Sequence, residues 1–162
     1  MTLRSVTQGP NVRSLPEIYG TGSYCFTPKH HGAGPAHAAQ WLPSLRRSDE
    51  FEVFNMADRH DFSDEHGNLY GLLIKTTSDG RELLVLGTRN EQISRFWNER
   101  QADAHWHGHP LYPCIPINKS DEGKINHKPP QEIFVRLVET GLLSQTKATR
   151  LRIGKHVGKL GI

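Results

Sequence analysis

The sequence has little cysteine and no long hydrophobic run. Its two cysteines, Cys25 and Cys114, can form one disulfide at most, which excludes a small secreted scaffold built on disulfides. No stretch approaches the roughly 18 consecutive apolar residues that a membrane-spanning helix requires. Residues 1–20 lack the apolar segment of a secretory signal peptide. These absences favour a cytoplasmic protein with no segment in the membrane.

The chain does contain enough apolar material for one modest core. Of its 162 residues, 35% are hydrophobic and 23% are charged, which suits one globular domain of ordinary size. Five of the ten prolines fall within residues 1–47, where the apolar residues follow no regular period. We therefore predict an irregular N-terminal arm over residues 1–47, with a short helix at residues 36–41, and an α+β domain over residues 48–162.

The hydrophobic pattern of this domain predicts a small antiparallel sheet. Leu69–Thr76 and Leu83–Leu86 have the composition of strands, and Asp79-Gly80 between them is typical of a two-residue hairpin turn. This turn would place Ile74 opposite Val85. Because both faces of the hairpin are apolar, we expect it to lie in the centre of the sheet and to be covered on both sides.

A third strand is predicted at Phe51–Asn55, and a helix is predicted directly after the hairpin. Thr88 and Glu91 have the spacing of a capping box, in which each residue bonds the backbone of the other. An apolar stripe at helical spacing follows, formed by Ile93, Phe96 and Trp97. The sequence thus predicts a helix over residues 88–100, and with it a ββα unit.

A helical hairpin is predicted at the C-terminal end. Pro129 and Pro130 should start the first helix at Gln131, and Gly141 is well placed to end it. Ser144 can cap a second helix, which we expect to run over residues 145–153 and to stop at Gly154.

The net charge of +3 is unevenly distributed along the chain. Residues 1–47 carry +4, residues 48–114 carry −6, and residues 115–162 carry +5. One interpretation is that the basic ends rest on the acidic middle. The other is that the basic C-terminal third meets phosphate or an acidic partner. The residues predicted to contact nucleic acid are Lys147, Arg150, Arg152, Lys155 and Lys159.

Three histidines stand at every second position and suggest a metal site. If the segment is extended, His105, His107 and His109 lie on one face, and imidazole is the commonest metal ligand. A fourth ligand from His60 would complete a zinc-type site that could activate water for hydrolysis. The alternative is structural: the rings diverge, pack against neighbours and bond backbone carbonyls.

A second histidine group, His30, His31 and His37, is more typical of a polar loop than of a nuclease site. No nucleophile elbow and no phosphate-binding glycine loop is present in the sequence.

The segment Trp106-His107-Gly108-His109-Pro110-Leu111-Tyr112-Pro113, together with the C-terminal pattern from Phe134 to His156, resembles small bacterial proteins. The similarity covers roughly residues 68–157. It implies a bacterial or phage-like source and implies no particular activity.

Three function classes follow from these observations. The first is a non-enzymatic binding or accessory protein whose basic C-terminal helices contact nucleic acid or an acidic protein. The second is a metal-dependent hydrolase or nuclease built on the histidine cluster, with a divalent metal such as zinc. The third is a protein-binding inhibitor or assembly factor.

Overall fold

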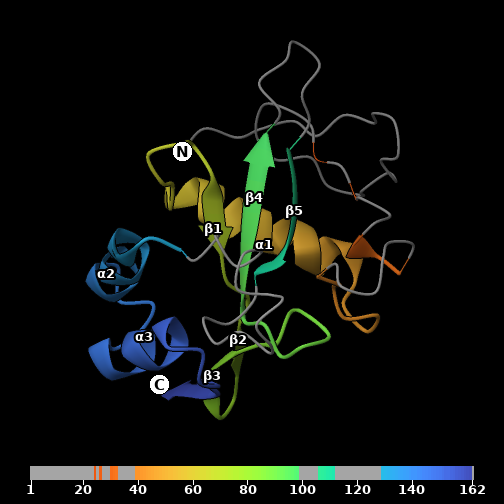
Figure 1. Cartoon of the computed structure of the whole chain (residues 1–162). Helices are drawn as coiled ribbons and strands as arrows, with labels where there is room; N and C mark the ends of the chain where they lie inside the picture. The colour runs from red at the N-terminus through yellow and green to blue at the C-terminus, as the bar shows by residue number, and fades with distance from the viewer. Residues whose placement is uncertain are drawn as a thin grey trace.

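The computed structural model describes residues 24, 26, 30–32, 39–98, 106–111 and 129–161, which form two small antiparallel sheets and three helices (Figure 1). The α+β class and the C-terminal helical hairpin are confirmed. Within the described residues, none of the helices is both long and apolar enough to cross a membrane. In chain order the elements are α1 (Arg47–Arg59), β1 (Leu69–Gly71), β2 (Ile74–Thr77), β3 (Gly80–Leu83), β4 (Ile93–Asn98), β5 (Trp106–Leu111), α2 (Gln131–Glu139), α3 (Gln145–Arg152) and β6 (Lys159–Gly161).

The first sheet has the strand order β1-β4-β5, and the second has the order β2-β3-β6. The segment predicted as one strand, Leu69–Thr76, is divided between them, because β1 pairs with β4 whereas β2 pairs with β3. Gln92, just before β4, connects the two sheets. Its buried side-chain amide donates to the carbonyls of Leu83 and Val157 and accepts from the Val157 amide.

The strand predicted at Phe51–Asn55 is wrong, because this segment lies inside α1. Phe51, Phe54 and Ala57 recur every three residues and are all buried, which is the spacing of a helix face rather than of a strand. The helix begins where the Arg46 amide donates to the Asp49 carboxylate (3.0 Å), and Asp49 and Glu50 complement its N-terminal dipole.

The helix predicted over residues 88–100 is also wrong. Residues 93–98 form β4, the central strand of the first sheet, and residues 99–100 lie outside the described residues. Glu91 does accept a backbone hydrogen bond, but from the Arg89 amide (2.6 Å) in a turn where Asn90 has a φ of 66°. The local helical pattern is overridden because β4 gains backbone pairing along both of its edges.

The hairpin forms in a different register from the one predicted. Ile74 pairs with Leu83 instead of Val85, so the turn residues are Ser78 and Asp79. Thr77 stabilises this turn by accepting from the Asp79 amide (3.3 Å) and donating to the Gly80 carbonyl (3.2 Å). Gly80 follows the turn with a φ of 110°, which only glycine adopts readily. The hairpin is not covered on both sides, since most of β2 is exposed.

The helical hairpin forms as predicted. Pro130 is the N-cap of α2, and Gly141 ends the helix with a φ of 76°. The Ser144 hydroxyl accepts from the Lys147 amide (3.3 Å) and caps α3, and Gly154 follows with a φ of 80°.

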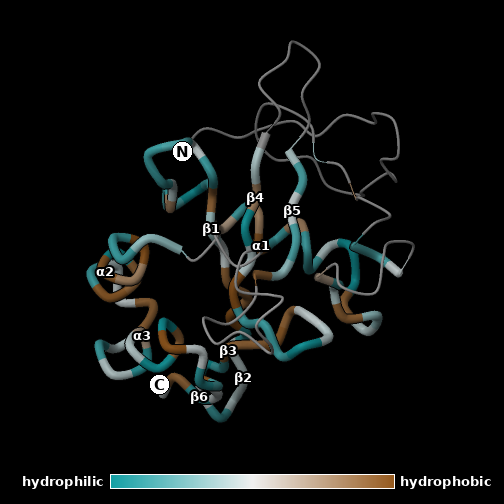
Figure 2. The backbone as a smooth tube through the Cα atoms, viewed as in Figure 1, coloured by the Kyte–Doolittle hydropathy of each residue, from teal (hydrophilic) through white to brown (hydrophobic). Residues whose placement is uncertain are grey.

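Two hydrophobic clusters pack on opposite faces of the first sheet. Figure 2 shows the backbone coloured by hydropathy, with hydrophobic residues in α1 and α2 as well as in the strands. On one face, Phe96 of β4 packs on Phe54 of α1, with ring centroids 5.4 Å apart. On the other, Ile93 and Leu111 share a cluster with Phe134 of α2. Strand side chains alternate between faces, so this division follows from the register of β4.

The N-terminal arm contributes to the first of these clusters. Tyr24, Phe26 and Trp41 are buried against α1 and β4, and Tyr24 forms an isolated parallel bridge with Trp106. The described part of the predicted helix at residues 36–41 is not helical, because Trp41 instead forms a bridge with Gly87. The domain boundary at residue 47 stays a prediction.

The contact between α1 and β1 gives a testable prediction. Gly71→Ala should lower the free energy of unfolding by about 1–3 kcal/mol, because the added Cβ would lie 2.4 Å from the Val53 carbonyl oxygen. Gly158→Ala is the matched control, since its Cβ would meet only His156 Nε2 at 3.7 Å. Denaturant titrations followed by circular dichroism measure both changes, and equal effects would contradict the packing argument.

Candidate functional site

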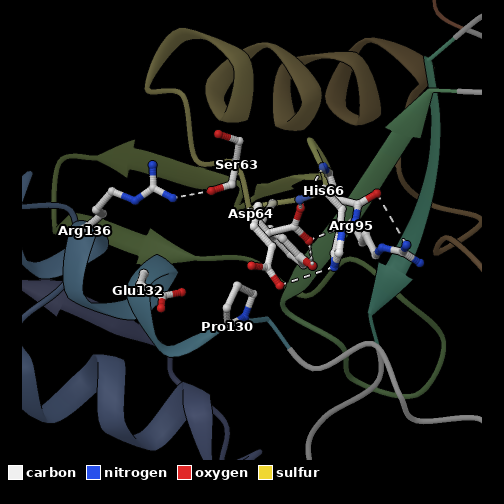
Figure 3. Close-up of a pocket in the computed structure, with 10 residues that line it drawn as sticks. Ser63, Asp64, His66, Arg95, Pro130, Glu132 and Arg136 are labelled. Atoms are coloured by element: carbon white, nitrogen blue, oxygen red, sulfur yellow. Dashed lines mark hydrogen bonds and ion pairs between the residues drawn. The ribbon is translucent and has the colours of Figure 1, made fainter. Parts of the chain in front are cut away.

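A cleft of about 940 Å³ opens beside the first sheet, between the loop after α1 and the start of α2 (Figure 3). The loop supplies one wall, β1 and β4 supply Tyr70 and Arg95, and α2 supplies the opposite wall. Its polar lining mixes both signs of charge, so the cleft is not a simple anion or cation site. The lining residues are Ser63, Asp64, Glu65, His66, Asn68, Tyr70, Arg95, Pro130, Glu132 and Arg136.

Asp64 organises the wall of this cleft. Its Oδ1 accepts from the amides of His66 (2.8 Å) and Asn68 (2.9 Å), and its Oδ2 accepts from Asn68 Nδ2 (2.9 Å) and the Tyr70 hydroxyl (2.9 Å). Desolvation pushes the pKa of Asp64 upward, but these hydrogen bonds outweigh it and hold the pKa below its ordinary value. With both oxygens so occupied, Asp64 acts as a charged structural centre and is poorly suited to be a general base.

The Asp64 carboxylate also affects the pKa of the Tyr70 hydroxyl. Burial, together with the hydrogen bond to Asp64, raises the pKa of the Tyr70 hydroxyl well above its ordinary value. The phenol therefore stays protonated and remains a donor to Asp64 at physiological pH.

Two arginines flank the cleft and have different roles. Arg136 of α2 donates to the carbonyls of Asp61 (2.5 Å) and Ser63, which fixes the loop against the helix. Arg95 of β4 donates weakly to Asn68 Oδ1 (3.4 Å), and its buried Nε has no partner among the described residues. Its guanidinium carbon lies 5.2 Å from the centre of the Trp97 ring. Arg95 thus links the cleft to the rest of the same sheet face.

Next to Arg95, the same face of the first sheet carries indole and imidazole side chains. His107 lies opposite Trp97 and His109 lies opposite Arg95 across the β4–β5 pair. The Trp97 ring contacts both imidazoles, with centroids 4.1 Å from His107 and 5.1 Å from His109. All four side chains are half-buried. We call Arg95, Trp97, His107 and His109 the imidazole–indole face.

The tautomer of neutral His109 follows from its hydrogen bond. Its Nδ1 lies 2.7 Å from the Pro110 carbonyl oxygen, which can only accept, so Nδ1 carries the hydrogen and Nε2 keeps a lone pair. His30 has the same arrangement with the Ala39 carbonyl (2.7 Å), and its ring lies 4.9 Å from that of His109. The structure therefore places His30 beside His109, although the two belong to separate histidine groups in the sequence.

The structure brings together only part of the predicted metal set. His107 and His109 share the imidazole–indole face, whereas the His60 ring stacks on Phe62 with centroids 5.1 Å apart. Burial, with a contribution from Arg59, lowers the pKa of His60. His105 lies outside the described residues, and within the described ones no group of three or more His, Cys, Asp or Glu side chains could hold a metal. A metal site that includes His105 stays a prediction.

The second predicted histidine group is divided as well. His31 Nε2 lies 3.0 Å from the buried Glu50 carboxylate, whose pKa is raised by desolvation although His31 opposes the rise. His37 lies outside the described residues. Sequence reasoning missed Glu50, Asp64 and Arg95, because their roles depend on partners from distant segments.

The five residues predicted to contact nucleic acid lie on α3 and the segment that follows it. Lys147 Nζ donates to the Lys159 carbonyl, and Arg150 Nη2 donates to the His156 carbonyl (3.2 Å). Four of the five are exposed and Lys147 is half-buried. We call Lys147, Arg150, Arg152, Lys155 and Lys159 the basic C-terminal surface.

No protein-family model, curated protein or solved structure matches this chain. Its function is therefore argued from the side chains themselves.

The hydrogen bonds of Asp64 predict a pH-dependent effect on stability. Asp64→Asn should lower the free energy of unfolding at pH 7 by about 1–2 kcal/mol, because an amide supplies only one of the two acceptor oxygens. Since the folded pKa is depressed, this stabilisation is present above the ordinary value of 3.8 and is lost as the pH falls through the folded pKa. The wild type and the variant should therefore converge below that pH in urea titrations.

Glu65→Gln is the control for this experiment, because the Glu65 side chain is 86% exposed and its carboxylate lies 3.4 Å from the exposed His66 Nε2. Its unfolding should match that of the wild type within about 0.5 kcal/mol. A constant difference between wild type and Asp64→Asn at every pH would disprove the role given to the Asp64 charge.

Proposed function

We propose that this protein is a non-enzymatic nucleic-acid-binding protein whose basic C-terminal surface contacts the phosphate backbone. One observation carries the proposal: among the described residues, none of the five cations forms an ion pair with a carboxylate. Lys159 does lie opposite Glu82 of the acidic middle in the β3–β6 pair, but the two side chains form no ion pair. A group of cations without internal counter-charge attracts polyanions, and the release of counterions from the nucleic acid drives binding.

The chemistry of these side chains favours contacts to phosphate rather than to base edges. Arg150 and Arg152 are exposed on a helix of only eight residues, and guanidinium groups bind phosphate oxygens through paired hydrogen bonds. Lys155 and Lys159 add flexible point charges beyond the helix. Contacts of this kind position a protein on nucleic acid without reading its sequence. An acidic protein surface would also attract these cations, so the experiments below distinguish nucleic acid from an acidic protein partner.

The first test compares two pairs of arginines. The double variant Arg150→Gln/Arg152→Gln should weaken binding to any oligonucleotide. It should also reduce the slope of log Kd against log salt concentration by the amount expected for the loss of about two phosphate contacts. Arg46→Gln/Arg59→Gln removes the same net charge from α1, where these arginines lie 3.4 Å from Asp49 and 3.7 Å from Glu52. Fluorescence anisotropy titrations at several salt concentrations measure both variants.

Two results would contradict the proposal. An equal loss of affinity in both double variants would indicate that only net charge matters. Competition by polyglutamate as strong as competition by unlabelled oligonucleotide would instead favour an acidic protein partner.

A further inference from the structure

The imidazole–indole face differs from the opposite face of the same two strands. On that face Phe96 packs on Phe54 of α1, Ser94 and Phe96 are fully buried, and Gly108 is buried between the strands. Gly108 is required there, because a Cβ would lie 2.2 Å from the Phe96 ring. The rings of Trp97, His107 and His109 are only half-buried. Packing explains the buried face, whereas the half-exposed rings leave aromatic surface that a ligand can cover.

The charges around these rings favour an anionic partner with planar groups. Arg95 places its guanidinium carbon 5.2 Å from the centre of the Trp97 ring, and among the described residues it forms no ion pair with a carboxylate. Asp64, a carboxylate in the adjoining cleft, accepts four hydrogen bonds from its own loop and from Tyr70.

Nucleobases joined by phosphates combine planar rings with negative charge. In a duplex the flat faces of the bases are already stacked on one another, so rings on a protein sheet cannot reach them. In a single strand the faces are free, and stacking on aromatic side chains or on an arginine plane stabilises binding by about 1–3 kcal/mol per base.

We propose that the imidazole–indole face binds a base and the adjoining phosphate of single-stranded nucleic acid. The base stacks on the ring surface, and Arg95 contacts the phosphate. This inference rests on the proposed nucleic-acid binding and adds to it the type of strand and a second, aromatic contact surface that is separate in sequence from the basic C-terminal surface.

The test uses a labelled single-stranded oligonucleotide and a hairpin duplex of the same composition, both in the presence of EDTA. Trp97→Ala should weaken binding of the single strand about tenfold or more, and it should leave duplex binding and the salt dependence unchanged because no charge is removed. Trp97→Phe keeps an aromatic ring and should restore most of the affinity. Binding of the single strand should also quench tryptophan fluorescence in the wild type, and this change should be reduced in Trp97→Phe.

A second pair of variants tests the imidazoles. His107→Ala should weaken binding of the single strand, whereas His60→Ala should not, because the His60 ring stacks on Phe62 after α1. Thermal unfolding of each variant identifies any general loss of structure. Should Trp97→Ala unfold, the Trp97→Phe fluorescence and the His107→Ala titration still decide the question.

The possible outcomes separate this inference from the proposed function. If the protein binds single strands and duplexes equally, and folded Trp97 and His107 variants bind as the wild type does, the single-strand inference is wrong and backbone binding stands. If Trp97→Ala loses single-strand affinity while Arg150→Gln/Arg152→Gln does not, the aromatic site stands and the role of the basic C-terminal surface is wrong. Absence of any binding at low salt overturns both.

Discussion

The pairing of β4 with β1 on one side and β5 on the other sets the positions of both the core and the candidate site. Because strand side chains alternate, the register that buries Phe96 against α1 also places Arg95 and Trp97 on the opposite face. Neighbouring segments approach so closely that glycine is required at two points, Gly71 against α1 and Gly108 against Phe96. One set of backbone hydrogen bonds therefore forms the core and the candidate site together.

Polar groups rather than apolar contacts hold the cleft in shape. Asp64 gathers four donors from its own loop and from β1, and Arg136 bonds two carbonyls of the same loop from α2. Charge-assisted hydrogen bonds of this kind are stronger than neutral ones and fix direction as well as distance. The network also reaches Arg95, because Asn68 donates to Asp64 and accepts from Arg95 Nη2 (3.4 Å).

The same use of carboxylates explains why the basic C-terminal surface has no acidic partner among the described residues. Glu50 is buried beside His31, and Glu91 is buried in the turn before β4, where burial raises its pKa. Asp64 is occupied by its loop. These three carboxylates thus serve their own helix, loop and turn and form no ion pair with Arg152 or Lys155.

Elements with strong local signals could be predicted from the sequence. Pro130, Gly141, Ser144 and Gly154 set the bounds of the helical hairpin, because proline, glycine and capping hydroxyls act on the few residues next to them. The basic character of residues 147–159 was equally visible in the sequence. The α+β class followed from these elements and from the strand composition near Leu69.

On either side of the hairpin, long-range packing and pairing selected helix or strand against the local pattern. The segment around Phe51 became helical because its apolar face packs on the sheet, and residues 93–98 became extended because two distant strands offered backbone partners. The imidazole–indole face depends on the second of these choices, since Trp97 meets His107 only when both segments are extended. Local spacing contains no information about which distant backbone supplies those hydrogen bonds, and for that reason the sequence indicated the histidines but not the tryptophan and arginine beside them.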